Sequence, residues 1–169
     1  MRLTQWSDYS LRVLMYCAAH EGRNAPVNIT EIADSHGISR SHLTKIVHQL
    51  GTHGLLETTR GRGGGMRLCK PATDINVGEV IRLTETDFAL VECFEAQTNQ
   101  CNLSPQCRLK GVLQKATNSF LSVLENVTLA DLIAPAASRT KVPSNSIPVS
   151  SKSSSETLLF KPSRSTGKL

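Results

Sequence analysis

The sequence predicts a mostly α-helical protein with one small β-hairpin, and three patterns support this prediction. Two short helix patterns flank Gly37, which permits a tight turn between them. Two strand-like runs flank the glycine-rich segment 61–65. Apolar residues recur every 3.5 residues over 109–127, which is typical of a helix that pairs with another helix. The predicted fold is therefore a winged helix-turn-helix plus a long dimerisation helix.

The charge of the chain is unevenly distributed. Of the net charge of +5, none comes from residues 1–137, where 13 basic and 13 acidic side chains balance. Residues 40–70 nevertheless carry six basic side chains against the single Glu57, which is a candidate nucleic-acid footprint. We find no signal-peptide pattern and no apolar run long enough for a membrane span, so we expect a cytoplasmic protein. In that reducing compartment, five cysteines predict free thiols and metal ligation instead of disulfides.

The first helix is predicted over residues 4–19, with Thr4 or Ser7 as its N-cap. Cys17 falls within it and is expected to be a small core residue. Asp8 lies in the first turn, where a carboxylate also suits the positive end of the helix dipole.

A helix-turn-helix follows. Asn28 and Glu31 form a capping-box pattern, which predicts that a short helix begins there. Ser39 can cap the next helix, predicted over 40–50. One face of this helix is apolar and packs inward, whereas the other is polar and suits a major groove. The expected DNA contacts on that polar face are Arg40, Ser41, Thr44, Lys45 and His48.

The hairpin reads as a wing. Its strands are predicted over 55–60 and 66–70, and alternation places Met66 and Leu68 on one face and Cys69 on the other. A nucleotide-phosphate loop would need a helix directly after the glycines, and none is predicted there. Phosphate contacts are expected from Arg60, Arg62, Arg67 and Lys70.

Beyond the wing, Asn76 and Glu79 predict a second capping box, opening a helix over about 77–85. The long helix then presents a seam with 3.5-residue spacing, formed by Leu109, Leu113, Ala116, Phe120, Val123 and Val127. A buried core helix would show the same pattern, but we favour dimerisation because readers of two-fold DNA sites need a dimer contact.

Three cysteines, Cys93, Cys101 and Cys107, lie in a polar loop spaced C-x7-C-x5-C. Thiolates are soft ligands for zinc or for iron-sulfur clusters, so we interpret these residues as metal ligands. A structural zinc site would need a fourth Cys or His, and Arg108, Leu109 and Lys110 follow instead. The site is therefore predicted to be open, which suits a sensor.

The chain divides into three predicted parts. Residues 1–72 form a winged helix-turn-helix DNA-binding region, and residues 73–134 hold the cysteine loop and the dimerisation helix. Residues 135–169 are rich in serine and basic side chains with few apolar ones, so this tail is predicted to be disordered.

These motifs resemble those of the Rrf family of winged-helix transcription regulators, and within it those of the nitric-oxide-sensing repressors. The resemblance covers roughly residues 1–133. The matching segments are Leu3-Thr4, Asp8-Tyr9, the wing from Arg60 to Leu68, Lys70-Pro71-Ala72, Pro105 to Lys110, Ser119 to Leu121, and Thr128 to Leu132.

The resemblance implies a homodimeric repressor whose subunits each hold one iron-sulfur cluster by Cys93, Cys101 and Cys107, with 4Fe-4S preferred and 2Fe-2S possible. In such regulators nitric oxide attacks the cluster, DNA affinity falls, and genes for nitric oxide detoxification are released. We hypothesise that Asp8 of the partner subunit supplies the fourth ligand; Glu92, Glu95 and solvent are rivals.

Two alternatives stay open. One is a regulator of the same family that senses iron or iron-sulfur status; relatives that govern cluster assembly carry a His where this chain has Lys110. The other is a constitutive DNA-binding protein with a structural zinc or thiol site. An enzyme is not expected, because the sequence shows no paired acid and base, no nucleophile motif and no nucleotide loop.

Overall fold

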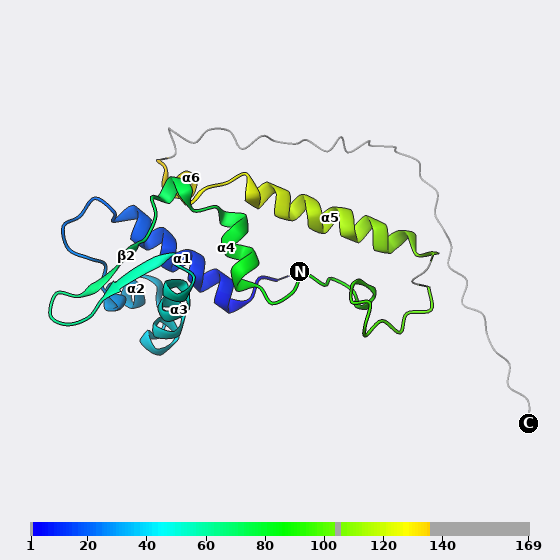
Figure 1. Cartoon of the computed structure of the whole chain (residues 1–169), viewed down its shortest axis with the longest axis horizontal. Coiled ribbons are helices and arrows are strands. Elements are labelled where there is room, and N and C mark those ends of the chain that lie inside the picture. The colour runs from blue at the N-terminus through cyan, green and yellow to red at the C-terminus, as the bar shows by residue number, and fades with distance from the viewer. Residues whose placement is uncertain (1, 104–105, 136–169) are drawn as a thin grey trace, which may run out of the picture.

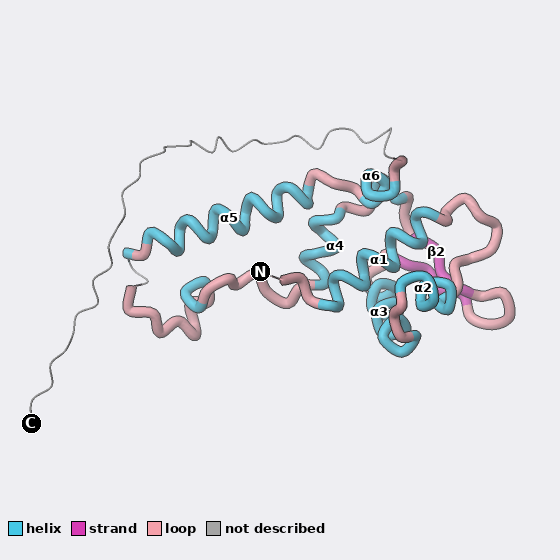
Figure 2. The backbone as a smooth tube through the Cα atoms, turned by 180° about the vertical axis from the view of Figure 1, so that it is seen from behind, coloured by secondary structure: helices cyan, strands magenta, loops and turns pink. Residues whose placement is uncertain are grey.

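The computed structural model describes residues 2–103 and 106–135. Figure 1 shows the hairpin at one end of the long axis and the loop before α5 at the other. The backbone in Figure 2 is dominated by helices, as predicted. The predicted tail, apart from Pro135, lies outside the described residues. In chain order the elements are α1 (Gln5–Ala19), α2 (Ile29–His36), α3 (Arg40–Thr52), β1 (Leu56–Thr59), β2 (Gly65–Leu68), η1 (Ala72–Asp74), α4 (Val77–Thr84), η2 (Glu92–Phe94), α5 (Arg108–Glu125) and α6 (Leu129–Ile133).

The predicted starts of α1 and α2 are confirmed. Thr4, and not Ser7, caps α1: its side chain accepts a hydrogen bond from the Ser7 backbone N–H. Asn28 and Glu31 form both reciprocal hydrogen bonds of the capping box at the start of α2. Gly37 ends that helix with φ +64°, a left-handed conformation that favours glycine.

One hydrophobic core unites α1, α2, α3, the wing and α6. Cys17 belongs to this core, as predicted, with an exposed fraction of 3 %. Burial raises the pKa of its thiol to about 12, so Cys17 stays protonated and is a poor metal ligand. The largest fully buried side chains of the core are Leu14, Ile32, Leu43, Ile46, Leu50, Ile75 and Leu129.

The wing is an antiparallel hairpin in which Leu56 pairs with Leu68 and Thr59 with Gly65. Met66 is buried and Leu68 half-buried, whereas Cys69 is exposed, which confirms the predicted alternation. The wing also gains a neighbour that the sequence did not predict: Val27, in the connection between α1 and α2, forms an antiparallel bridge with Met66.

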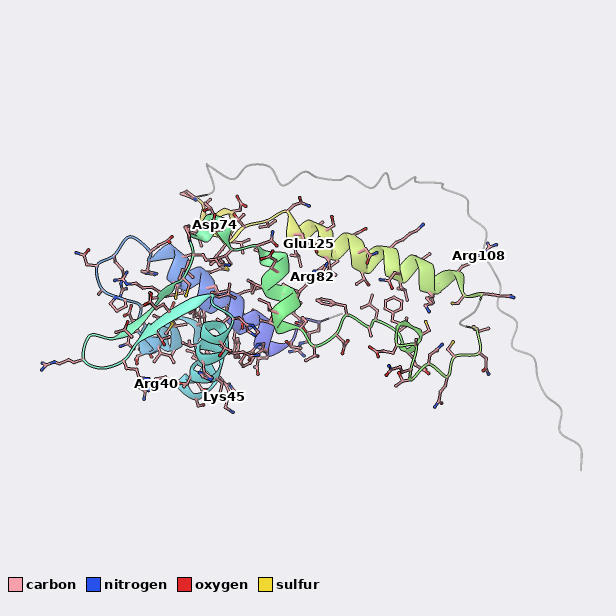
Figure 3. All side chains as sticks on the ribbon, viewed as in Figure 1. Arg40, Lys45, Asp74, Arg82, Arg108 and Glu125 are labelled. Atoms are coloured by element: carbon pink, nitrogen blue, oxygen red, sulfur yellow. The ribbon has the colours of Figure 1, made fainter. Side chains whose placement is uncertain are left out.

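The second predicted capping box is only half formed. The Asn76 side chain accepts from the Glu79 N–H, as expected at the start of α4. Its amide nitrogen, however, donates to the Glu125 carbonyl at the end of α5 (2.6 Å). Arg82 of α4 also pairs with the Glu125 carboxylate, and Figure 3 shows their side chains turned toward each other. The Asn76 motif therefore joins two helices as well as starting one.

The predicted seam on α5 is exposed at Leu109, Ala116 and Val123 and half-buried at Leu113 and Phe120, so α5 is not a buried core helix. Within α5 only Thr117 and Leu121 are buried, and α5 packs against α4. Val127 lies beyond the end of α5 and does not belong to the seam, because the helix stops at Glu125. We call the remaining residues the apolar stripe: Leu109, Leu113, Ala116, Phe120 and Val123.

The short helix α6 was missed in the sequence. Thr128 and Asp131 form its capping box, a pattern that could have revealed it. Leu129 is fully buried, and the helix packs on α1 and η1. The chain thus returns from α5 to the core that α1 forms. None of the helices within 2–103 and 106–135 has both the length and the apolarity needed to cross a bilayer.

Candidate functional site

The outward face of α3 is polar and exposed, as predicted. Arg40, Ser41, Thr44, Lys45 and His48 are all exposed, while the opposite face is buried in the core. Figure 3 shows Arg40 and Lys45 at the same edge of the molecule. The Thr44 hydroxyl donates to the Arg40 carbonyl (2.8 Å), which leaves its oxygen free to accept. This surface has the donors and acceptors that base edges and phosphates require.

The structure separates the three wing arginines that the sequence grouped together. Arg60 and Arg62 are exposed on the connection between the strands, where Gly61 and Gly63 adopt φ +100° and +81°. Arg67, although exposed, directs its guanidinium to the backbone carbonyls of Arg23 and Asn24. The Arg60 and Arg62 side chains are therefore open to solvent, whereas Arg67 contacts the connection between α1 and α2.

A shallow hollow of about 110 Å³ lies between α1 and α3, beside the polar face. Two polar residues there, Gln5 and His42, were not predicted from the sequence. His42 follows Ser41 in the same exposed run of α3, which could have identified it. The hollow is lined by Gln5, Trp6, Tyr9, His42, Lys45 and Ile46.

The three clustered cysteines lie in one loop between α4 and α5, and all are free thiols. Cys93 is buried, and Cys101 and Cys107 are half-buried. Among the described residues, no three Cys, His, Asp or Glu side chains lie close enough together to hold a metal ion. The structure therefore puts the thiols in one segment without gathering them. Their soft donor chemistry fits an iron-sulfur cluster, and ligation commonly folds such a loop further.

Side chains of the loop already shape it. The Glu92 carboxylate accepts from the Gln100 N–H at 2.6 Å, and the Asn99 side chain accepts from the Cys101 N–H at 3.0 Å. The first contact closes the segment between Cys93 and Cys101. Glu92, a rival for the fourth ligand, thus has one carboxylate oxygen engaged by the backbone.

Asp8 lies on α1, apart from the cysteine loop in the chain. It forms an ion pair with Arg12 at 2.9 Å, and their hydrogen bond raises the pKa of the Arg12 guanidinium. Both side chains line a wide, open hollow of about 900 Å³ at the start of α1, together with His36 of α2. Asp8 is therefore accessible from outside the subunit.

A direct link joins α1 to the root of the cysteine loop. Glu85, which caps the C-terminus of α4, accepts from the Thr4 N–H (2.8 Å) and the Thr4 hydroxyl (3.2 Å). A carboxylate at this place also suits the positive end of the α1 dipole. We call this contact the Thr4–Glu85 tether. It connects the segment that leads to Cys93 with the helix that supports α3.

Comparison with known proteins agrees with these features. The chain is 54% identical over 133 residues to the HTH-type transcriptional regulator NsrR of Bacillus licheniformis, covering 79% of this chain and 92% of that protein. It is 51% identical to NsrR of Bacillus subtilis, over 79% and 90% of the two chains.

Solved structures support the fold. Oxidised CymR of Staphylococcus aureus matches with a TM-score of 0.64 and 25% identity, covering 80% of this chain and 98% of that one. IscR of T. potens matches with a TM-score of 0.61 and 27% identity, over 79% and 86%.

The profile of one family, described as Rrf2, iron-dependent transcriptional regulator, matches residues 3–135. That span includes the helix-turn-helix, the wing, the cysteine loop and α5. The resemblance noted in the sequence is thereby confirmed, and the chain belongs to the Rrf2 family of transcriptional regulators.

Proposed function

We propose that this protein is a DNA-binding transcriptional repressor that senses nitric oxide through an iron-sulfur cluster and releases genes for nitric oxide detoxification. The proposal is supported above all by the identity of 54% and 51% with two NsrR proteins over 133 residues, a span that includes both the helix-turn-helix and the cysteine loop. We place its action in the cytoplasm, where its DNA target lies.

We propose that the exposed face of α3 enters the major groove and that Arg60 and Arg62 contact the flanking phosphates. Residues near the start of α3, such as Arg40 and Ser41, are suited to base edges. Arg40→Ala should relax sequence preference, whereas Arg62→Ala should weaken all sequences similarly. Equal losses on operator and random DNA in both variants would contradict this division.

We infer a homodimer from the apolar stripe. Leu109 and Val123 are 60 % and 54 % exposed in one subunit, near opposite ends of α5. Repeats of 3.5 residues pair helices along such a stripe. A two-fold dimer also presents two copies of α3 to successive major grooves, about 34 Å apart.

We propose that Cys93, Cys101 and Cys107 hold one cluster per subunit, with 4Fe-4S preferred and 2Fe-2S possible. The cluster would supply the centre that reacts with nitric oxide. For the fourth ligand we propose Asp8 of the partner subunit, because Asp8 faces an open hollow on its own subunit. Arg12 would then orient the carboxylate from its other side.

The Thr4–Glu85 tether supports a route by which a change in the cysteine loop can affect the DNA-binding face of α3. A change in the cysteine loop reaches Glu85 through the seven residues that precede Cys93. Loss of the tether would free the first turn of α1, which lines a hollow with His42 and Lys45 of α3. A coupling of about 1–3 kcal/mol, typical of allosteric proteins, suffices.

The test is an absorbance titration of protein purified without oxygen, with operator binding followed in parallel. We expect a coloured protein whose absorbance band is lost as nitric oxide is added, together with its affinity for DNA. Cys101→Ala should abolish the colour, whereas Cys69→Ala, which changes an exposed wing thiol, should keep it.

The remaining outcomes separate the alternatives. A coloured protein that nitric oxide leaves unchanged would favour sensing of iron or iron-sulfur status. A colourless protein with bound zinc would favour a constitutive DNA-binding protein. If Asp8→Ala changes neither the spectrum nor the nitric oxide response, Asp8 is not the fourth ligand.

A further inference from the structure

Arg67 contacts backbone carbonyl groups of the protein, which a side chain used only for phosphate binding would not need to do. It is the third residue of β2. Its guanidinium donates to the Arg23 carbonyl at 3.1 Å and, through its other terminal nitrogen, to the Asn24 carbonyl. Two parallel donors on one planar group fix both distance and direction, which a lysine cannot reproduce.

The carbonyls that receive Arg67 are themselves held in place. Arg23 folds the connection between α1 and α2 around its own guanidinium, donating to the Ala25 carbonyl at 3.0 Å and to the Pro26 carbonyl at 3.3 Å. The same guanidinium pairs with both carboxylate oxygens of Glu31, at 2.8 and 2.9 Å. The connection is therefore a fixed platform tied to the capping box of α2.

A backbone contact joins the wing to this platform at a second point. The Val27 N–H donates to the Met66 carbonyl at 3.0 Å, and the Met66 N–H donates to the Val27 carbonyl at 2.8 Å. Gly65 makes this approach possible, since a Cβ there would lie 2.4 Å from the Val27 carbonyl oxygen. These contacts add to the packing of Leu56 and Met66 in the core, and they matter because a two-stranded hairpin is only marginally stable by itself.

We propose that Arg67 is a positioning residue: it clamps the wing to the connection between α1 and α2 and thereby fixes where Arg60 and Arg62 lie relative to α3. Arg67 then contributes to DNA affinity without touching DNA. The proposal rests on the proposed function in one respect, the contact of the wing tip with phosphates. The clamp itself is a property of the free protein.

The first experiment uses the full chain without DNA. Amide hydrogen exchange is measured at Val27 and Met66 in the wild type, Arg67→Lys, Arg67→Ala and Arg62→Ala. We expect exchange to accelerate about tenfold in both Arg67 variants, as for the loss of about 1.4 kcal/mol of local stability. Arg62→Ala should exchange like the wild type. Unchanged exchange in Arg67→Ala would overturn the clamp whatever happens on DNA.

The second experiment measures the affinity for DNA as a function of salt, at a temperature where all variants are folded. Arg67→Lys keeps the charge, so a direct phosphate contact would survive with an unchanged salt slope. We expect instead that Arg67→Lys loses nearly as much DNA affinity as Arg67→Ala. Its salt slope should be smaller by about 1–2, because Arg60 and Arg62 each lose a phosphate contact.

Two outcomes on DNA are informative. Wild-type affinity and slope in Arg67→Lys, together with faster exchange, would overturn the positioning role. If Arg62→Ala and Arg60→Ala also leave the affinity and the salt slope unchanged, the wing does not contact DNA. That result would contradict both the proposed wing contact and the positioning role of Arg67. The clamp in the free protein would still be decided by the exchange data.

Discussion

Two parts of the molecule differ in how far they bury their apolar side chains. One is the amino-terminal part, residues 2–85, and the other is the carboxy-terminal part made by the cysteine loop and α5. In the first, helix caps are satisfied and the apolar faces of α1, α2 and α3 are buried in one core. In the second, α5 buries only Thr117 and Leu121 and leaves its apolar stripe open.

The difference indicates which part is complete in one subunit. A fold whose apolar groups and caps are satisfied internally needs no partner to adopt its shape. In the carboxy-terminal part the apolar stripe is exposed or half-buried in one subunit, and the three thiols share a loop without converging. The amino-terminal part therefore forms the stable frame, and we propose that a second subunit and a cluster complete the rest.

The largest expected effect tests whether stability resides in the amino-terminal core. Leu14→Ala removes a fully buried side chain and should lower the free energy of unfolding by about 2–5 kcal/mol. Leu109→Ala makes the same chemical change at a site that is 60 % exposed, and should change monomer stability by less than about 0.5 kcal/mol. Denaturant titrations in dilute protein compare the two. Equal losses would contradict the contrast.

The next effect tests whether the apolar stripe needs a partner. Val123→Asp should weaken dimerisation by about 100-fold or more, because unpaired like charges at an interface cost several kcal/mol. Ser122→Asp, at an exposed site beside it, is the control and should leave the dimer intact. Sedimentation velocity over a range of concentrations measures both. A Val123→Asp protein that stays dimeric would place the interface elsewhere.

A smaller effect tests the link between the two parts. Glu85→Ala removes the acceptor for the Thr4 N–H and should cost about 1 kcal/mol of stability, the scale of a helix cap. It should also bring the operator affinities measured before and after nitric oxide closer together. Glu85→Gln keeps an acceptor oxygen and should lie between Glu85→Ala and the wild type. If Glu85→Ala responds to nitric oxide as the wild type does, coupling does not pass through the tether.

The smallest effect is a pH dependence at Glu31. The hydrogen bond from Arg23 holds the pKa of the Glu31 carboxyl below its usual value. A lowered folded-state pKa contributes stability above the unfolded-state pKa, and that contribution disappears as pH falls through the folded-state pKa. Melting temperatures of the wild type and Glu31→Gln should therefore differ at neutral pH and converge in acid. A constant difference across that range would mean that this ion pair adds nothing.

Much of the fold was predictable because its signals are local. The caps at Asn28 and Ser39, the turn at Gly37 and the alternation around Met66 act over about four residues of sequence. For the same reason five residues of the polar face of α3 were predicted, although His42 was not. The start of α6 could also have been predicted, since Thr128 and Asp131 form a capping box like the one that predicted α2.

The sequence by itself determined the helix starts, the wing, the polar face of α3 and the grouping of three cysteines in one loop, because spacing along the chain decides each of them. Only the tertiary structure decided that Arg67 holds the Arg23 and Asn24 carbonyls, and that Glu85 reaches Thr4. These contacts join residues more than 40 positions apart, and no local periodicity reports on them. The use of a charged side chain, for DNA or for the protein itself, depends on which groups the fold brings within its reach.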